Sequence, residues 1–419
     1  MFIYVVKSGD SLFSISLKYQ VSQESIRMVN GLQTFQLVPG QDLIIPSNIY
    51  IVQPNDSLYS IAKASFISSR TIKLYNNITS NSLQVGMQLY LPPRPTYTVE
   101  ALSYITPSTP NKNQFLVQNS ADLHTYFGIF NYQIRDDGSL SSLDDQPIVQ
   151  LAKHYRVAPL AVITNLTSTE FSKTLTQKML NSPIIKDKLI ENIYNLLKQK
   201  GYVGVNIDFE RVGEEERDLY SGFLYSLKKR LKPEGYITSV AIPAKTNDTT
   251  PWLLGYDYGG IGAAVDFAFI MAYDWHEASS PPGPVAPIKE IEKTIQYSLN
   301  YMKRNQIVLG FARYGYNWTM SGDKVLHAVG ISISKAVNLA MKYQVPIKFS
   351  TEYQQSFFSY RDEKGQKHIV WFEDIRGKAK KLELVEKYKL RGGGAWQLGL
   401  EFPQSHLLAK KFFTIKKRI

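Results

Sequence analysis

Eight short apolar runs recur between residues 97 and 419, and stretches with helical periodicity separate them. Runs of this length are typical of buried strands, and strands that alternate with helices are typical of a parallel sheet. Eight such strands can close on themselves, so we expect residues 97–419 to form a (β/α)8 barrel. The runs cover residues 99–105, 123–132, 159–165, 203–210, 237–244, 265–274, 307–314 and 393–398.

The interval between the last two runs contains more than one helix. Within it, residues 356–360 and 368–372 flank Asp362-Glu363-Lys364-Gly365, a polar segment that is typical of a hairpin turn. The predicted fold of this part is therefore an α/β TIM barrel with a small α+β insertion.

The first 93 residues contain an internal repeat. A shift of 46 residues aligns Tyr4 with Tyr50 and Pro46 with Pro92 without a gap, and chance does not hold one register over such a length. Each copy predicts a short strand, a turn, two short helices and a closing strand, which is a β-α-α-β unit. Other matched pairs are Val6/Val52, Asp10/Asp56, Ser11/Ser57, Leu12/Leu58, Ile26/Ile72, Asn30/Asn76 and Gly40/Gly86.

The repeated unit resembles the LysM module, which binds glycans that contain N-acetylglucosamine. The resemblance covers residues 2–46 and 49–93, and it rests on the GDSL-like turn, the Asn that ends the second helix and the closing PGQ-x-L-x-I-P. It implies a groove between the first helix with its preceding turn and the loop before the last strand. The glycan-binding residues that it implies are Gly9, Asp10, Ser11, Asn55, Asp56 and Ser57.

Asp10 and Asp56 also have a purely structural interpretation. Asp at the start of a helix caps free backbone N–H groups and needs no ligand to explain it. After the second copy, Pro92-Pro93-Arg94-Pro95 predicts a short, stiff linker that holds both modules at a fixed distance from the barrel.

Composition excludes several kinds of site and partner. The chain has no cysteine, which excludes disulfides, a thiol nucleophile and a Cys-ligated metal. Its six histidines never fall at a metal-ligand spacing, so we expect no metal and no cofactor. No apolar run is long enough to cross a membrane, and the first residues lack the pattern of a signal peptide. We expect a monomer without a nucleic-acid partner.

The net charge of +12 is concentrated at the end of the chain, where KKFFTIKKRI contributes five cations. The tail can be interpreted as an attraction to an anionic polymer or as a last amphipathic helix or strand. A second cluster, Lys378, Lys380 and Lys381, is expected to be a solvated helix face.

The segment Gly204-Val205-Asn206-Ile207-Asp208-Phe209-Glu210 is the most informative stretch of the barrel. Side chains alternate along a strand, so Asn206, Asp208 and Glu210 share one face, which in a barrel points into the lumen. Three polar groups in an apolar lumen are costly unless they serve a function. A solvated strand end would explain Glu210 but not all three polar groups. Glu210 also lies at the carboxyl end of its strand, where the active sites of such barrels lie.

The spacing of Asp208 and Glu210 suggests acid catalysis. They lie roughly 6–7 Å apart along a strand. Two carboxylates this close do not both ionise easily, so one should keep its proton toward neutral pH. A protonated Glu at the barrel mouth is the general acid that a glycosidic oxygen needs. The residues alone do not identify the nucleophile.

VGVNIDFE resembles the DGxDxDxE signature of glycoside hydrolase family 18, from which it departs at Val203 and Asn206. Met271-Ala272-Tyr273-Asp274-Trp275 resembles the family's strand-six motif, and Tyr314-Gly315-Tyr316 resembles its strand-seven motif. Trp396 resembles the strand-eight Trp beneath the −1 sugar. The resemblance covers essentially all of residues 97–419.

The resemblance implies substrate-assisted catalysis with retention of configuration. Glu210 would protonate the leaving oxygen, Asp208 would orient the 2-acetamido group that attacks, and Tyr273 would donate a hydrogen bond to it. Asn206 would hydrogen-bond to Asp208 without being able to take its proton, so the pH profile should shift. The substrate-binding residues that the resemblance implies are Asn206, Asp274, Trp275, Tyr314, Tyr316 and Trp396.

Two LysM modules before a family 18 barrel resemble the spore cortex-lytic and sporulation-associated glycosylases of endospore-forming bacilli. This implies an N-acetylglucosaminidase of spore peptidoglycan, located in the coat or cortex region and made in the mother cell without a signal peptide. Two alternatives stay open: a chitinase of similar mechanism, and a glycan-binding spore coat protein in which Asn206 marks a decayed site.

Overall fold

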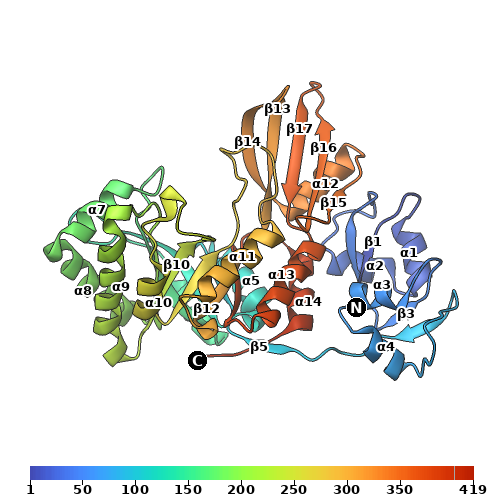
Figure 1. Ribbon diagram of the computed structural model, residues 1–419, viewed down its shortest axis with the longest axis horizontal. Helices are drawn as coiled ribbons and strands as arrows, with labels where there is room; N and C mark the ends of the chain where they lie inside the picture. Colours follow the sequence, from blue (N-terminus) through green and yellow to red (C-terminus); the bar gives the residue numbers. More distant parts are fainter. Residues whose placement is uncertain (401) are drawn as a thin grey trace.

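The structure is a computed structural model that describes residues 1–400 and 402–419. It has a barrel, a sheet that rises from the barrel, and two small N-terminal modules beside that sheet (Figure 1). Within the described residues, no helix is long and apolar enough to span a membrane.

The barrel is closed by eight parallel strands, which confirms the predicted (β/α)8 architecture. Every predicted run supplies one of them, and β8 is buried at each of its positions, as expected for a strand covered on both faces. In order around the barrel, the strands are β6 (Leu102–Ile105), β7 (Tyr126–Gln133), β8 (Ala158–Thr164), β9 (Gly204–Asp208), β10 (Ile237–Pro243), β11 (Phe267–Met271), β12 (Ile307–Ala312) and β18 (Gly392–Trp396).

Helices surround the barrel and bury one face of each strand. On β9, Val205 and Ile207 belong to this outer core, and Phe209 just beyond the strand stacks on Phe223 with ring centroids 5.8 Å apart. The opposite side chains therefore point into the lumen. The helices are α5 (Pro110–Ser120), α6 (Gln146–His154), α7 (Lys173–Asn181), α8 (Pro183–Lys200), α9 (Arg217–Leu231), α10 (Tyr258–Ala264), α11 (Ile288–Leu299), α13 (Ile375–Lys387) and α14 (Pro403–Phe412).

The insertion between β12 and α13 is a five-stranded antiparallel sheet in the order β14-β13-β17-β16-β15, with one helix. The predicted hairpin is β16–β17, in which Ser356 pairs with Phe372. The Tyr314-Gly315-Tyr316 motif opens β13 instead of lying in the seventh barrel strand, which ends at Ala312. The elements are β13 (Tyr314–Ser321), β14 (Lys324–Ser332), α12 (Ile333–Lys342), β15 (Lys348–Ser350), β16 (Gln355–Arg361) and β17 (Lys367–Phe372).

Both N-terminal modules have the predicted β-α-α-β order, and each closes with an antiparallel strand pair. They share one apolar core, in which the rings of Phe2 and Tyr50 lie 4.7 Å apart. Module 1 contains β1 (Phe2–Val5), α1 (Leu12–Tyr19), α2 (Gln23–Val29) and β2 (Asp42–Ile45). Module 2 contains β3 (Ile49–Ile51), α3 (Leu58–Ser65), α4 (Ser69–Tyr75) and β4 (Gln88–Tyr90).

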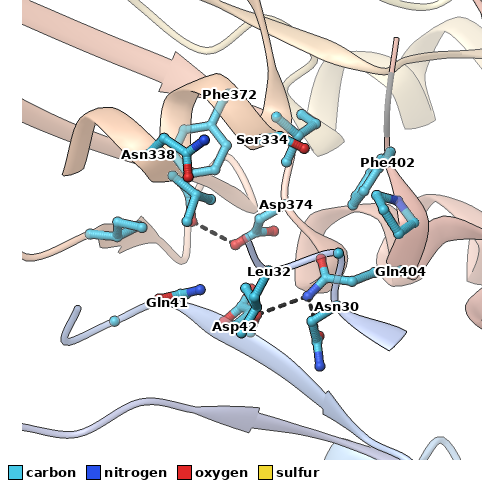
Figure 2. A pocket seen from close by; sticks show the side chains of 17 residues that line it. Asn30, Leu32, Gln41, Asp42, Ser334, Asn338, Phe372, Asp374, Phe402 and Gln404 are labelled. Carbon is cyan, nitrogen blue, oxygen red and sulfur yellow. Dashed lines mark hydrogen bonds between the residues drawn. The ribbon is translucent and has the colours of Figure 1, made fainter. Parts of the chain in front are cut away.

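Module 1 packs directly on the barrel domain, so it has a fixed position as predicted, but the predicted separation from the barrel is wrong for this module. Arg376 donates a 2.8 Å hydrogen bond to buried Asp42. Gln404 donates to the side chain of Asn30 at 2.7 Å (Figure 2). The backbone N–H of Ile347 bonds the carbonyl of Pro39 at 2.9 Å. These contacts come from both the insertion and the barrel helices, and they fix module 1 beside them.

The basic tail is part of the fold. The tail includes the last residues of α14 and then forms β19 (Phe413–Ile415), which pairs in parallel with β5 (Tyr97–Val99). Arg418 forms an ion pair with Glu100 at 2.5 Å, and Lys410 forms one with Asp122 at 2.6 Å. Several of the tail's cations are thus neutralised within the protein, which favours the structural interpretation of the tail.

The second lysine cluster is not a solvated face, contrary to expectation. Lys381 is buried against the carboxylate of Glu373. Lys378 is also buried, with its ammonium 3.6 Å from the centre of the Phe311 ring. Only Lys380 keeps substantial contact with solvent, paired with Glu383 at 2.6 Å.

Candidate active site

Glu210 is held at the carboxyl end of the barrel by its own backbone. It lies two residues beyond the end of β9. Its N–H donates to the side-chain oxygen of Asn165 at 3.0 Å, and the Asn165 amide donates to the Glu210 carbonyl at 2.8 Å. Sequence analysis did not single out Asn165, because one Asn after a strand carries no distinctive signal.

Asn206 lies below the carboxylates and is fully buried, at 0% exposure. Its side-chain oxygen accepts a 2.9 Å hydrogen bond from Tyr104, and its amide donates to Ser239 at 3.0 Å. Both ends of the amide are therefore occupied. The expectations that Asn206 contacts the substrate and hydrogen-bonds to Asp208 do not fit this geometry.

Asp208 is buried in the lumen, at 5% exposure. Its Oδ1 atom has no hydrogen-bond partner among the described residues. Burial, and secondarily the charge of Glu210, raise the pKa of the Asp208 carboxyl well above its ordinary value. The raised pKa favours the protonated form of Asp208.

Glu210 has the pKa of a general acid. Burial and, secondarily, the charge of Asp274 raise the pKa of its carboxyl to about 7, while Arg211 acts in the opposite direction. The sequence predicted that the neighbouring charge of Asp208 would keep Glu210 protonated, whereas the charge that raises the pKa of Glu210 is that of Asp274. An acid whose pKa lies near the working pH transfers protons efficiently.

Asp274 connects the barrel to the insertion. It follows β11 with a left-handed backbone (φ 64°), which Asp tolerates better than most residues. Its Oδ1 atom accepts hydrogen bonds from Tyr314 at 2.8 Å and Tyr316 at 3.1 Å. Burial by the surrounding protein raises the pKa of Asp274 to about 6, and the two tyrosine hydroxyls act in the opposite direction. Part of the Asp274 side chain is nevertheless exposed to solvent. The first strand of the insertion therefore positions this acid.

Aromatic side chains complete the barrel mouth. Trp396, at the end of β18, is half-buried, with its ring 4.8 Å from that of Phe130 and 5.5 Å from that of Tyr104. The ring of Tyr273 lies 6.2 Å from that of Tyr314, beside Asp274. Trp275 directly follows Asp274 and packs partly against the outer core, as Tyr273 also does.

In the modules, the two predicted acids close turns. Each aspartate accepts one hydrogen bond from a tyrosine hydroxyl and one from a backbone N–H. For Asp10 the donors are Tyr4 at 2.6 Å and Lys7 at 2.8 Å; for Asp56 they are Tyr50 at 2.9 Å and Gln53 at 2.8 Å. The helix caps are instead Ser11 and Ser57. These four side chains thus have structural roles, and Gly9 and Asn55 provide the left-handed residues of the turns.

The two implied grooves differ in exposure. In module 2, Tyr59 is 74% exposed and Gly86 has open space around it. In module 1, Gly40 lies against the carbonyl of Ile347, so the insertion covers part of the loop that forms one groove wall. Only the groove of module 2 has both walls free of the barrel domain.

Comparison with known proteins defines the class. Residues 102–401 match the sequence model of glycosyl hydrolases family 18, and residues 4–46 and 50–92 match that of the LysM domain. The chain belongs to glycosyl hydrolase family 18 and carries two LysM domains.

Several relatives resemble the whole chain. YdhD of Bacillus subtilis (strain 168) is 44% identical over 419 residues, which is 100% of both proteins. The cortical fragment-lytic enzyme of Bacillus anthracis is 39% identical over 429 residues, which cover 99% of each. The crystal structure of the spore cortex-lytic enzyme SleL of Bacillus cereus matches with a TM-score of 0.89 at 34% identity, over 99% of each chain.

Proposed function

We propose that this protein is a peptidoglycan hydrolase of the spore cortex, an N-acetylglucosaminidase that cleaves after N-acetylglucosamine. The observation that carries the proposal is the position of Glu210 at the carboxyl end of the barrel, where burial and Asp274 raise its pKa to about 7, beside Asp208, whose pKa is also raised. Similarity over the whole chain to the cortical fragment-lytic enzyme and to SleL supports the cortex as the source of the substrate.

The proposed mechanism uses the substrate's own acetamido group. Its carbonyl oxygen attacks the anomeric carbon while Glu210 gives its proton to the leaving glycosidic oxygen. A cyclic oxazolinium ion results, and water then opens it as Glu210 takes a proton back, so configuration is retained. Asp208 orients the acetamido group, and Tyr273 donates a hydrogen bond to its oxygen.

Substrate contacts are assigned to the residues around these acids. Trp396 stacks beneath the sugar, and Asp274 contacts it while Tyr314 and Tyr316 hold the carboxylate in place. Trp275, next to Asp274, is assigned to the same set, whereas the fully buried Asn206 is not. Asn206 instead supports the lumen through Tyr104 and Ser239.

The proposed partner is the glycan strand itself, bound by the two LysM domains of residues 2–46 and 49–93 while the catalytic domain of residues 97–419 cleaves it. The exposed groove of module 2 is the better candidate for the anchor, because the insertion covers part of the module 1 loop. A monomer in the coat or cortex region, made in the mother cell, completes the proposal.

Comparing two substrates tests this function. The full-length protein is incubated with purified cortex fragments and with chitin oligosaccharides, and the products are identified by mass. We expect faster release of fragments with N-acetylglucosamine at the new reducing end from cortex. Hydrolysis of chitin oligosaccharides alone would identify a chitinase. No product from either, with protein still pelleting with cortex, would identify a binding protein.

A further inference from the structure

A cavity of about 660 Å³ lies at the junction of module 1 and the barrel domain. Its volume is within the range of small-molecule pockets. Module 1 contributes Met28 and Leu32, α5 contributes Phe115 and Leu116, and the start of α14 contributes His406. None of the residues assigned to the candidate active site lines it, so it is a separate pocket.

One wall of this cavity is a buried guanidinium that has no counter-ion among residues 1–400 and 402–419. Arg313 directly follows β12 and is 6% exposed. Its Nε atom has no hydrogen-bond partner, and no described carboxylate forms an ion pair with it. Burial lowers the pKa of Arg313 to about 10, which still leaves it charged at neutral pH. A buried, unpaired charge is strongly destabilising unless something neutralises it.

The other ionisable residues of the lining, Arg27 and His406, are basic, and burial lowers the pKa of the His406 imidazole. His406 lines both this cavity and a smaller one next to it, where buried Lys378 and His124 also lie. Arg27 lines the large cavity but has its own partner, Glu24, at 2.6 Å. Asp122, which influences His406, is paired with Lys410. The described lining therefore has positive charge and no acid to balance it.

We propose that this cavity binds a carboxylate group of an acidic glycan fragment, with the guanidinium of Arg313 as its partner. The proposal rests on the proposed function, because peptidoglycan carries carboxylates on its lactyl groups and peptides. A planar guanidinium binds a carboxylate through two parallel hydrogen bonds. Phe115 and Leu116 supply the apolar walls that a sugar ring or a methyl group contacts.

The position of the cavity connects it to the rest of the protein. Arg313 immediately precedes Tyr314, which donates to Asp274 in the candidate active site. Leu398, two residues after Trp396, also lines the cavity. A carboxylate bound here would connect module 1 with Arg313, which leads into the insertion, and with Leu398, in the loop that follows Trp396.

The test is a binding measurement on the full-length protein. A Glu210→Gln background keeps cortex fragments intact, and the ligands are native fragments and fragments whose carboxylates have been amidated. We expect the native fragments to bind at least ~10-fold more tightly and to raise the melting temperature more. Arg313→Met should remove this preference and raise the melting temperature without ligand, because an unpaired buried charge is deleted. Arg230→Met, which removes an exposed arginine paired with Glu191, should leave the preference intact.

Two results would overturn the inference. One is equal binding of native and amidated fragments, or an unchanged preference in Arg313→Met. The other involves Glu401, which lies outside the described residues. If Glu401→Gln lowers the melting temperature only while Arg313 is present, the chain supplies its own carboxylate. Hydrolysis of cortex is measured separately, with the protein in which Glu210 is intact. Failure of the proposed enzymatic function can therefore be distinguished from failure of carboxylate binding in the cavity.

Discussion

The hydroxyl of Tyr104 donates a 2.9 Å hydrogen bond to the amide oxygen of Asn206 at the centre of the barrel. The amide nitrogen donates in turn to Ser239, and no hydrogen bond joins Asn206 to Asp208 among the described residues. The protonation of Asp208 therefore depends on burial and on Glu210 rather than on a hydrogen bond from Asn206.

Asn206→Asp should move the basic limb of the kcat/KM profile to higher pH, by up to about 1 pH unit. A carboxylate at 206 adds negative charge beneath Asp208 and Glu210, which favours their protonated forms. Glu210 then remains an acid at higher pH. The pH–rate profile on cortex fragments measures this. Ser239→Ala removes one hydrogen bond of Asn206 without adding charge and should leave the limb in place. A limb that stays or moves to lower pH in Asn206→Asp contradicts the assignment.

Asp274→Asn should have the opposite effect. In the unmodified protein, activity should fall as pH rises through about 7, because Glu210 loses its proton there. Removing the negative charge of Asp274 lowers the pKa of Glu210, so the fall should begin at lower pH. The same profile checks it, and Asp248→Asn serves as a control because that exposed acid pairs with Lys245. An unchanged basic limb in Asp274→Asn would show that the two acids are uncoupled.

Gly40→Ala should destabilise the protein more than Gly86→Ala, the matched change 46 residues later in the repeat. Both glycines have left-handed backbones, with φ of 83° and 85°, so both variants pay a similar conformational cost. Only at Gly40 would the added carbon lie 1.8 Å from the Ile347 carbonyl. The extra loss should be about 1–3 kcal/mol, measured by chemical denaturation. Equal losses would mean that module 1 does not pack on the barrel domain in solution.

Asp56→Ala and Tyr59→Ala should separate structure from glycan binding in module 2. Asp56→Ala removes acceptors for Tyr50 and Gln53 and should cost about 1–3 kcal/mol of stability, with cortex binding retained by folded protein. Tyr59 is exposed, so Tyr59→Ala should weaken binding without lowering stability. Sedimentation with insoluble cortex gives the binding. If Asp56→Ala binds weakly while fully folded, its carboxylate contacts the glycan.

The sequence was sufficient for the barrel and for the repeats because their signals are local. Each barrel strand is a continuous apolar run, and the polar alternation of β9 identified the lumen face. The insertion was only partly predicted. Its hairpin has a clear turn, but β14 is mostly exposed and carries no regular apolar pattern.

The remaining errors concern contacts between residues far apart in the chain. The packing of module 1 depends on Asp42 with Arg376 and Asn30 with Gln404, single polar pairs that no local pattern marks. Burial of Lys381 is a different case, because its partner Glu373 is only eight residues earlier but lies in the loop before the helix, outside the helical pattern. Asn206 was correctly placed in the lumen, but its partner Tyr104 lies on a different strand.

The central claim is that Glu210 is the acid that cleaves spore-cortex glycan. The most direct measurement is the mass of products from purified cortex fragments, with the unmodified protein beside Glu210→Gln and with Glu214→Gln as an acidic control. We predict new N-acetylglucosamine reducing ends from the unmodified protein and from Glu214→Gln, and a rate at least ~10²-fold lower from Glu210→Gln. Products at an undiminished rate from Glu210→Gln, or none from the unmodified protein, would contradict the account.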